Sequence, residues 1–291
     1  MRILLTGADG QVGFELARTL APLGELRAMG HAALDLENPD ALVAACRSQK
    51  PRLIVNAAAY TAVDKAESEP DRAHAVNGRA PAILAAEARR LGAVLVHYST
   101  DYVFDGRKRS PYDENDPPAP LGVYGRSKLE GEQAIAASGC RHLVFRTSWV
   151  YGPRGRNFLA AMLAMARTHG QVRVVDDQRG APTTSFFLAQ ATARALVSIP
   201  PPGIASGIYH LSAAGETSWA GFARAIFERA ARWPGFRAPG VVPIASSEYP
   251  TAARRPRNSV LRNDKFTEAF GFAADSWESQ LDACLARMRP P

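Results

Sequence analysis

The fold is decided by the stretch RILLTGADGQVG at residues 2–13. It opens with a short apolar run typical of a buried strand, and residues 11–23 continue it with the pattern of an amphipathic helix. Between the two, Gly7, Gly10 and Gly13 are spaced G-x-x-G-x-x-G. Such glycines permit a tight turn, close approach of a pyrophosphate to the backbone, and close packing of helix on strand. Because the N–H groups at the start of the helix then face the phosphates, the stretch predicts a dinucleotide-binding site.

Strands and helices continue to alternate outward from this turn. The predicted strands are residues 2–5, 25–29, 52–55, 93–97 and 142–147. The predicted helices are residues 11–23, one that opens at Asn38-Pro39-Asp40, and residues 70–91 and 123–137. Because the strands are apolar on both faces, we expect a parallel sheet that is covered on both sides. The sequence therefore predicts the α/β class, with a Rossmann-type doubly wound sheet.

The pattern loosens after Tyr151. Further helices are predicted at residues 158–168, 186–197, 219–233 and 277–288, and strands at 172–175, 207–211 and 241–244. The run Pro200-Pro201-Pro202-Gly203 punctuates the chain. We predict a dinucleotide-binding domain over residues 1–150, with a returning segment near 176–200. A smaller, interleaved substrate-binding domain is predicted over residues 151–175 and 201–291.

Composition narrows the classes of partner and compartment. The chain has 291 residues and a net charge of +7, but its sharpest basic cluster is Arg254-Arg255-Pro256-Arg257. With no basic run of about five to eight residues, we predict no nucleic-acid binding, and a small anionic ligand explains the charge. No apolar stretch reaches the ~18 residues of a membrane span, so no membrane association is predicted. The three cysteines, Cys46, Cys140 and Cys284, are too few and too scattered for a disulfide framework and indicate a cytoplasmic protein.

The end of the second predicted strand bears on the choice of cofactor. An acid there would bind the ribose of NAD, whereas its absence favours NADP. Residues 27–31 read RAMGH and contain no acid, so NADPH is predicted, with NADH as the second option. Asp35-Leu36 comes slightly later, and it either contacts the adenine or caps the next helix. The small residues Ala57-Ala58-Ala59 follow the third strand and suit a cofactor that lies against the backbone.

A phenol and an ammonium are placed four residues apart by Tyr124 and Lys128. On a helix this spacing puts both on one face. A carbonyl reductase needs a proton donor, and a nearby cation lowers the pKa of a tyrosine from about 10. Ser99 and Thr100 end the fourth strand, where a parallel sheet binds its ligands, and offer hydroxyls to a substrate carbonyl. The six histidines show no metal-ligand spacing, so no metal site is predicted.

Together the glycine turn, Ser99-Thr100-Asp101 and Tyr124-x-x-x-Lys128 resemble the extended short-chain dehydrogenase/reductases. More narrowly, the chain is similar to the dTDP-4-dehydrorhamnose reductase family from end to end. The matching segments are residues 55–67, 97–104, 146–151, 177–183 and 255–259.

The resemblance implies an enzyme that reduces the C4 ketone of a nucleotide-linked sugar with NADPH. It implies that Thr100 and Tyr124 hold the carbonyl, that Tyr124 gives the proton, and that Lys128 binds the nicotinamide ribose and tunes the phenol. The implied cofactor contacts are Gly7, Asp9, Gly10, Gln11, Val12, Gly13, Asp35, Leu36, Ala57, Ala58, Ala59, Tyr124 and Lys128. The implied substrate contacts are Thr100, Asp101, Tyr102, Trp149, Arg255 and Asn258, the last two at the diphosphate.

The resemblance leaves two other functions open. A non-catalytic regulatory subunit with the same fold would bind the cofactor without turnover, although the intact Thr100, Tyr124 and Lys128 favour catalysis. A nucleotide-sugar epimerase or dehydratase would retain and regenerate NAD. Some relatives form metal-bridged dimers through acidic residues, but Gln190 is not acidic, so we predict a monomer or homodimer without metal.

Overall fold

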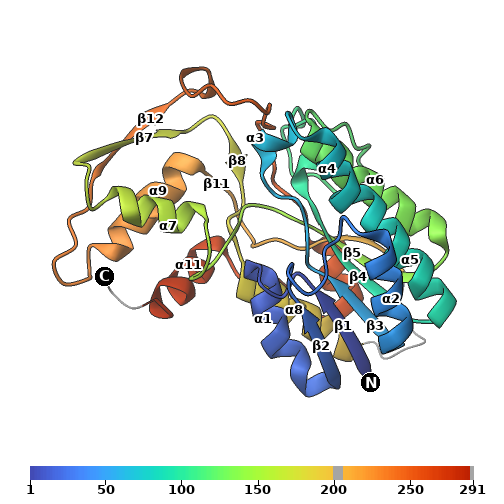
Figure 1. Ribbon diagram of the computed structural model, residues 1–291. Helices are drawn as coiled ribbons and strands as arrows, with labels where there is room; N and C mark the ends of the chain where they lie inside the picture. The colour runs from blue at the N-terminus through green and yellow to red at the C-terminus, as the bar shows by residue number, and fades with distance from the viewer. Residues whose placement is uncertain (199–205, 289–291) are drawn as a thin grey trace.

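A six-stranded parallel sheet forms the centre of the larger half of the molecule (Figure 1). The structure is a computed structural model that describes residues 1–198 and 206–288. The strand order is β10-β5-β4-β3-β1-β2, so the order reverses between β1 and β3. The strands are β1 (Arg2–Thr6), β2 (Glu25–Met29), β3 (Leu53–Asn56), β4 (Val94–Thr100), β5 (Arg141–Thr147) and β10 (Gly207–His210). The predicted doubly wound α/β sheet is confirmed, and such sheets bind ligands beside the reversal point.

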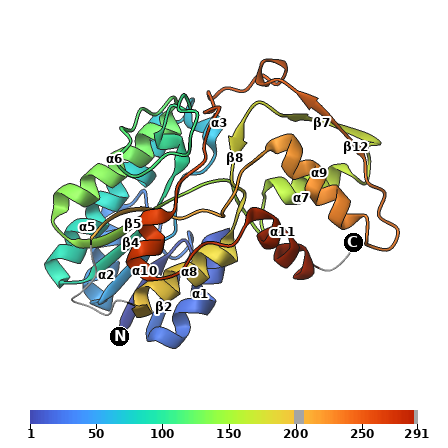
Figure 2. The ribbon, with the colours of Figure 1, turned by 180° about the vertical axis from the view of Figure 1, so that it is seen from behind.

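Helices cover both faces of this sheet, because successive residues of each strand point to opposite sides. On one face Ile3 and Leu5 belong to a buried cluster, and on the other Leu4 belongs to a second one. The first face is covered by α1 (Gln11–Leu20), α8 (Ser185–Ser198) and α10 (Asp264–Phe270), as Figure 2 shows from behind. The second is covered by α2 (Pro39–Gln49), α5 (Ala80–Leu91) and α6 (Val123–Ser138).

The single helix predicted over residues 70–91 is interrupted. It consists of α4 (Pro70–His74), a π-helical stretch at Ala75–Arg79, and α5. Pro81 lacks the N–H that an α-helix needs at this point, which accounts for the widened turn before it. The turn contains Asn77, whose amide oxygen accepts from the backbone N–H of Tyr60 at 2.9 Å. The irregularity thus fastens the segment that follows β3 in place.

The smaller half has a hydrophobic cluster of its own, which includes Tyr151, Phe222 and Trp277. Its main elements are α7 (Phe158–Met165), β7 (Gln171–Val175), α9 (Trp219–Ala230), β12 (Gly240–Ile244) and α11 (Trp277–Ala286). Short strands connect it to the larger half: β6 (Val150–Tyr151), β8 (Arg179–Gly180), β9 (Thr183–Thr184) and β11 (Thr217–Ser218). Two short helices of the larger half, α3 (Val63–Ala66) and α4, pack against α6.

Two elements differ from the predicted division of the chain. We predicted all of residues 201–291 in the smaller half, but β10 pairs with β5, and Phe266 and Phe270 of α10 pack in the cluster under the large sheet. Side-chain burial explains this, since those phenylalanines cover the face that α8 leaves open. The predicted boundary at residues 200–201, with the run Pro200–Gly203, lies outside the described residues. In the part of the chain that the structure describes, no helix combines the length and apolarity of a membrane span.

Candidate active site

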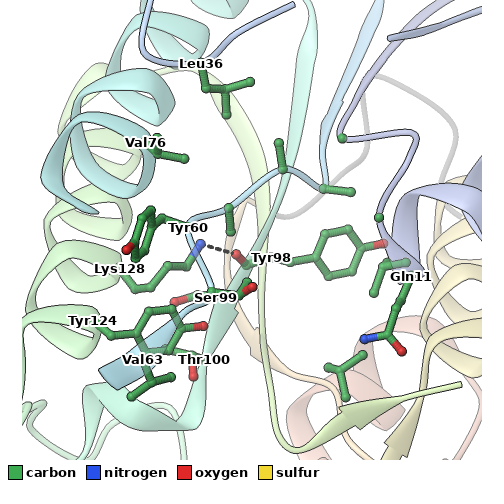
Figure 3. Close-up of a pocket in the computed structure, with 18 of the residues that line it drawn as sticks. Gln11, Leu36, Tyr60, Val63, Val76, Tyr98, Ser99, Thr100, Tyr124 and Lys128 are labelled. Atoms are coloured by element: carbon green, nitrogen blue, oxygen red, sulfur yellow. Dashed lines mark hydrogen bonds between the residues drawn. The ribbon is translucent and has the colours of Figure 1, made fainter. Parts of the chain in front are cut away.

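A cavity of about 680 Å³ lies at the carboxyl ends of the central strands (Figure 3). Its lining includes residues that directly follow β1 and β3 and residues that end β4 and β5. The predicted residues that line it are Gly7, Asp9, Gly10, Gln11, Val12, Asp35, Leu36, Ala57, Ala58, Ala59, Thr100, Asp101, Tyr102, Tyr124, Lys128 and Trp149. The structure thus gathers most of the predicted site from six separate segments.

The glycine turn forms one wall, and its close contacts leave no room for side chains. Gly7 has a φ of +71°, and a Cβ there would lie 2.5 Å from the backbone nitrogen of Ala58. A Cβ on Gly13 would lie 1.9 Å from the carbonyl oxygen of Gly7, so Gly13 packs beneath the turn and does not line the cavity. Helix α1 begins after Gly10, where no side chain caps its first N–H groups. These donors fit the phosphates of a dinucleotide.

The segment after β2 adjoins this wall. The Asp9 carboxylate accepts from the backbone N–H of His31 at 3.0 Å, which ties the glycine turn to the end of β2. Asp35 accepts from the N–H of Glu37 at 2.9 Å, while the cap of α2 is Asn38, which accepts from Ala41. The alternative that Asp35 caps the next helix is therefore wrong. Its place in the cavity wall leaves the contact with adenine as the open prediction.

Tyr124 lies in the first turn of α6 and points toward Thr100 (Figure 3). The helix comes close because Gly125 has no side chain: a Cβ there would lie 2.2 Å from the carbonyl oxygen of Tyr102. Burial raises the pKa of Tyr124 to about 12, and a hydrogen bond with Thr100 opposes the rise. Thr100 also donates to Asp101 Oδ1 at 3.0 Å. The phenol and the hydroxyl thus form one buried pair at the end of β4.

Lys128 is the third member of the predicted catalytic set, and it faces the same cavity from α6. Its Nζ lies 2.6 Å from the carbonyl oxygen of Tyr98 and 3.1 Å from Nε2 of His97 (Figure 3 shows the first bond). Burial lowers the pKa of Lys128 to about 8, with Glu132 opposing the change. We predicted that Lys128 lowers the pKa of Tyr124. In this structure the pKa of Tyr124 is raised instead, because burial dominates and the amine is turned to β4.

Two unpaired hydroxyls near the catalytic set support a bound polar ligand. Ser99 Oγ and Thr147 Oγ1 are buried and line the cavity. Within the described ranges, 1–198 and 206–288, neither has a hydrogen-bond partner. Buried polar groups are normally hydrogen-bonded, so these two fit a ligand with polar atoms of its own.

The predicted sugar contacts Asp101, Tyr102 and Trp149 also line the cavity. Tyr102 packs edge-on against Tyr124, with ring centroids 5.6 Å apart. Burial raises the pKa of Asp101 to about 6, although hydrogen bonds with Ser259 and Thr100 lower it. Trp149 has a φ of +47°, unusual for a bulky residue and typical of functional sites.

Trp149 stacks on Trp219 of α9, with centroids 3.5 Å apart and planes 6° apart. Both rings line the cavity, so the smaller half supplies part of its wall. Sequence reasoning missed Trp219, which stands 70 residues further along the chain and belongs to an ordinary amphipathic helix. Asn56 and His97 lie in the segments 55–67 and 97–104 that resemble the family but were not among the predicted site residues; in the structure His97 Nε2 lies 3.1 Å from Lys128 Nζ.

Arg255 and Asn258 do not line this cavity. Arg255 pairs with both carboxylate oxygens of Asp64, at 2.7 and 3.2 Å, and hydrogen-bonds to Tyr102. Arg255 therefore contacts the site only indirectly, through Tyr102, which lines the cavity.

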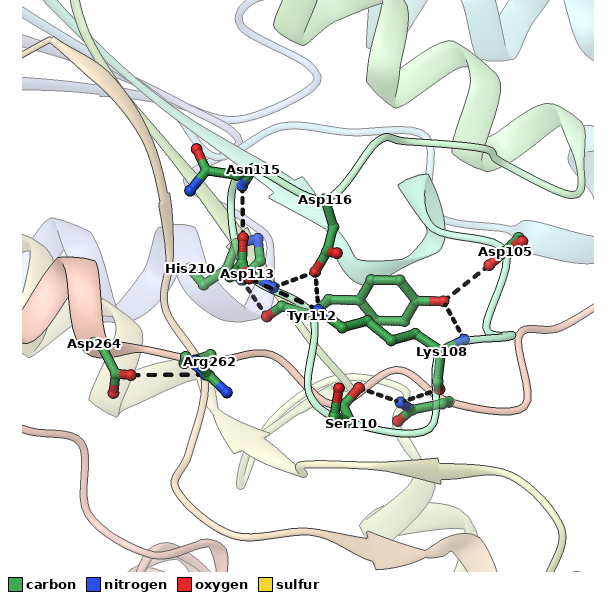
Figure 4. A network of polar contacts seen from close by, with 11 residues as sticks. Asp105, Lys108, Ser110, Tyr112, Asp113, Asn115, Asp116, His210, Arg262 and Asp264 are labelled. Carbon is green, nitrogen blue, oxygen red and sulfur yellow. Dashed lines mark hydrogen bonds and ion pairs between the residues drawn. The ribbon is translucent and has the colours of Figure 1, made fainter.

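The Asn258 amide donates to the carbonyl oxygens of Lys108 and Ser110, at 2.8 and 3.0 Å. These carbonyls belong to the irregular loop at residues 105–120, which Figure 4 shows held by polar contacts. Within the loop, the Tyr112 hydroxyl donates to Asp105, and Lys108 Nζ donates to Asp116 at 2.5 Å. Asn258 thus fastens an ordered loop, and its amide nitrogen is engaged by that loop.

Comparisons with known proteins identify the family to which the chain belongs. A family profile described as the RmlD substrate binding domain matches residues 1–289. A dTDP-4-dehydrorhamnose reductase of Burkholderia thailandensis is 48% identical over 98% of this chain and 98% of its own length. One of Escherichia coli K12 is 45% identical over 96% of this chain and 95% of its own. A crystal structure of a dTDP-4-dehydrorhamnose reductase of Bacillus anthracis in complex with NADP is 33% identical, with a TM-score of 0.91 and 99% of each chain covered.

Proposed function

This chain belongs to the dTDP-4-dehydrorhamnose reductase family of extended short-chain dehydrogenase/reductases, and from that premise we propose that it reduces the C4 keto group of dTDP-4-dehydro-L-rhamnose to give dTDP-L-rhamnose, with NADPH. The observation that carries this proposal is the convergence of Thr100, Tyr124 and Lys128 on one cavity with the glycine turn. A reductase needs a proton donor beside its nicotinamide, and this cavity has the residues for both.

The chemistry of the chain's own residues follows from their burial. When bound, NADPH supplies a hydride to the carbonyl carbon. Tyr124 breaks its O–H bond and gives the proton to the carbonyl oxygen, so that the ketone gains one hydride and one proton. Because burial raises the pKa of Tyr124 to about 12, the phenol keeps its proton at neutral pH and is available as a general acid. The Thr100 hydroxyl, next to the phenol, orients the same oxygen.

NADPH is the proposed cofactor, and NADH is the second option. The free N–H groups after Gly10 support a site for the pyrophosphate, and the small residues Ala57–Ala59 support a cofactor lying along the backbone. The end of β2 continues as Gly30-His31, without the acid that would favour NAD. The relative of Bacillus anthracis is described as a complex with NADP.

The proposed sugar contacts are Asp101, Tyr102 and Trp149, and we add Trp219 to them. The stacked indoles offer a flat apolar surface with polar edges, which suits a hexose ring or a base. Arg255 supports the site by its bond to Tyr102. Asn258 is proposed to support the loop that contains Lys108 rather than to bind the diphosphate.

An assay of cofactor consumption tests the proposal. Purified protein is mixed with NADPH and dTDP-4-dehydro-L-rhamnose, and oxidation is followed by the loss of nicotinamide absorbance. We expect stoichiometric oxidation and formation of dTDP-L-rhamnose, with the UDP-linked sugar and NADH as comparison substrates. Binding of NADPH without oxidation would support the regulatory-subunit alternative. NAD that co-purifies with the protein, together with no net use of NADPH, would support an epimerase or dehydratase.

A further inference from the structure

The side chain of Asp9 lies across the end of β2. A Cβ on Gly30, the residue that follows β2, would lie 1.9 Å from Asp9 Oδ2, and the three atoms nearest to it all belong to the Asp9 carboxylate. Two hydrogen bonds hold the glycine turn there. The backbone N–H of Ala8 donates to the Met29 carbonyl at 3.2 Å, and that of His31 donates to Asp9 Oδ2 at 3.0 Å. The Asp9 carboxylate therefore occupies the space that a side chain at position 30 would take.

This space is where dinucleotide-binding sheets of this kind distinguish NAD from NADP. An acid at the end of the second strand accepts a hydrogen bond from the ribose 2′-hydroxyl of NAD, whereas a nearby cation accommodates the 2′-phosphate of NADP. Position 30 is a glycine, so the end of β2 supplies no acid of its own. Asp9 supplies one from the neighbouring turn, and it lines the cavity together with His31.

One oxygen of the Asp9 carboxylate is left for a ligand. Oδ2 accepts from the His31 N–H, whereas Oδ1 has no hydrogen-bond partner within residues 1–198 and 206–288. Asp9 is exposed and lines the cavity, so a ligand has access to its carboxylate. An ionised carboxylate accepts hydrogen bonds but donates none, and it repels other anions. Asp9 thus suits a hydroxyl and opposes a phosphate.

The charged side chains that accompany Asp9 on this wall do not offer a free cation. His31 Nδ1 lies 3.8 Å from Asp35 Oδ1, and Arg72 Nε donates to Glu37 Oε1 at 2.7 Å. Of these five lining residues, three are acids and two are basic, and each basic group already faces an acid. A 2′-phosphate at this wall would therefore meet more negative than positive charge, which is unfavourable.

The two other basic side chains in the described lining belong to other parts of the cavity. Lys128 donates to the Tyr98 carbonyl of β4. Arg156 precedes Asn157, whose amide donates to Gln11 of α1 at 2.9 Å. Neither has a hydrogen bond to the segment that follows β2, so neither neutralises Asp9 there.

We propose that Asp9 is the residue by which this chain discriminates between NADH and NADPH: its carboxylate accepts from the 2′-hydroxyl of NADH and repels the 2′-phosphate of NADPH. The preference for NADPH is then weaker than a missing acid at the end of β2 would give by itself, and NADH is a usable second cofactor. The inference deepens the proposed function and rests on its assignment of the cavity to a nicotinamide dinucleotide.

Calorimetric titration of the protein with NADH and with NADPH, without any sugar, measures the two Kd values. Asp9→Asn keeps an oxygen for the His31 N–H but removes the negative charge, so NADPH should bind more tightly and NADH no more tightly than before. The ratio of the Kd for NADH to that for NADPH should rise about tenfold. Glu25→Gln is the matched control, because it removes the same charge at the other end of β2, outside the cavity lining. It should leave both Kd values unchanged.

Moving the carboxylate tests whether the space itself decides the preference. Asp9→Ala should raise the ratio, and Asp9→Ala combined with Gly30→Asp should bring it back toward the wild-type value, because the acid then stands at the end of the strand. Position 30 has room for it once the Asp9 carboxylate, which supplies the three nearest atoms, is removed.

The inference would be overturned if Asp9→Asn changed both Kd values by the same factor, or neither. A double variant that keeps the ratio of Asp9→Ala would overturn it as well. These titrations contain no sugar, so either result leaves the reductase assay unaffected. A wild-type protein that binds neither dinucleotide would contradict the proposed function together with this inference.

Discussion

Two buried cations lie near Glu132, and only one of them is paired with it. Arg146 of β5 donates to both Glu132 oxygens, from Nε at 2.9 Å and Nη2 at 2.6 Å, and the two side chains are 3% and 1% exposed. Lys128 stands four residues before Glu132 on α6, but its own hydrogen bonds go to a carbonyl and an imidazole. Within one small region, therefore, one cation has its charge neutralised and the other does not.

The difference separates stability from chemistry. A paired buried charge becomes a large penalty when its partner is removed, because the survivor is left uncompensated. A buried cation without an ion-pair partner already carries this desolvation penalty, and the penalty lowers its pKa. We infer that the Arg146–Glu132 pair holds α6 against the sheet, whereas the charge of Lys128 can respond to the reaction proposed for the neighbouring cavity.

The largest effect is expected for a substitution next to Lys128 that changes the rate of the reaction rather than the stability of the protein. Tyr124→Phe removes the proposed proton donor beside Lys128 but leaves both cations in place. We expect kcat to fall by about 10²–10⁴-fold, the usual contribution of a general acid, while the Kd for NADPH changes little. Steady-state kinetics and cofactor titration measure the two quantities. Turnover equal to that of the wild type would contradict the assignment of Tyr124 as the acid.

Arg146→Met tests the paired cation. It leaves Glu132 buried without a partner, so the free energy of unfolding should fall by about 3–5 kcal/mol. Urea denaturation at pH 7 measures the change. The double variant Arg146→Met with Glu132→Leu removes both charges and should recover much of this loss. If the double variant is no more stable than the single one, the loss comes from packing rather than from an uncompensated charge.

The surroundings of Lys128 and Arg146 also show what the sequence could and could not predict. The strand, the glycine turn and the Tyr124–Lys128 pair were predictable because each depends on spacing within one element. The hydrogen bonds of Lys128 to β4 were not predictable, because they depend on the alignment of elements that are neighbours in space but not in the sequence. Likewise Trp149 and Trp219 meet across the two halves, and Arg255 meets Asp64 from 191 residues away.

The predicted long helix failed for a different reason. Apolar periodicity continues through residues 70–91 and hides the π-helical stretch, which Pro81 and the polar contacts of Asn77 explain only once the neighbouring elements are in place. The short strands of the smaller half, such as β8 and β11, are two residues long and leave no periodic pattern at all.

Lys128, the cation that is not paired with Glu132, should change the pH dependence of the free energy of unfolding. Burial lowers the pKa of Lys128 to about 8 from its ordinary 10.5, so between these values the unfolded chain binds a proton that the folded protein does not. The contribution of Lys128 to the free energy of unfolding therefore rises with pH across that window. Below pH 8 the buried side chain is charged, and it destabilises the folded protein by the full amount. Lys128→Met removes the penalty.

The free energy of unfolding of Lys128→Met, relative to that of the wild type, should thus be higher at pH 7 than at pH 10 by up to about 3 kcal/mol. Denaturation of both proteins at both pH values gives this difference, and the subtraction cancels groups they share, such as Cys46, whose pKa burial raises to about 12. A difference in stability that stays constant from pH 7 to pH 10 would mean that Lys128 titrates alike in the folded and unfolded states.

The smallest effect is expected for an ion pair of the same chemistry in a different place. Arg173 and Glu248 approach to 2.6 Å, as closely as Arg146 and Glu132, but their side chains are 60% and 50% exposed. Solvent already stabilises both charges there, so Arg173→Met should lower the free energy of unfolding by less than about 1 kcal/mol. The same denaturation series measures it. A loss as large as that of Arg146→Met would show that contact distance, rather than burial, sets the strength of these pairs, and the contrast between Arg146 and Lys128 would then need another cause.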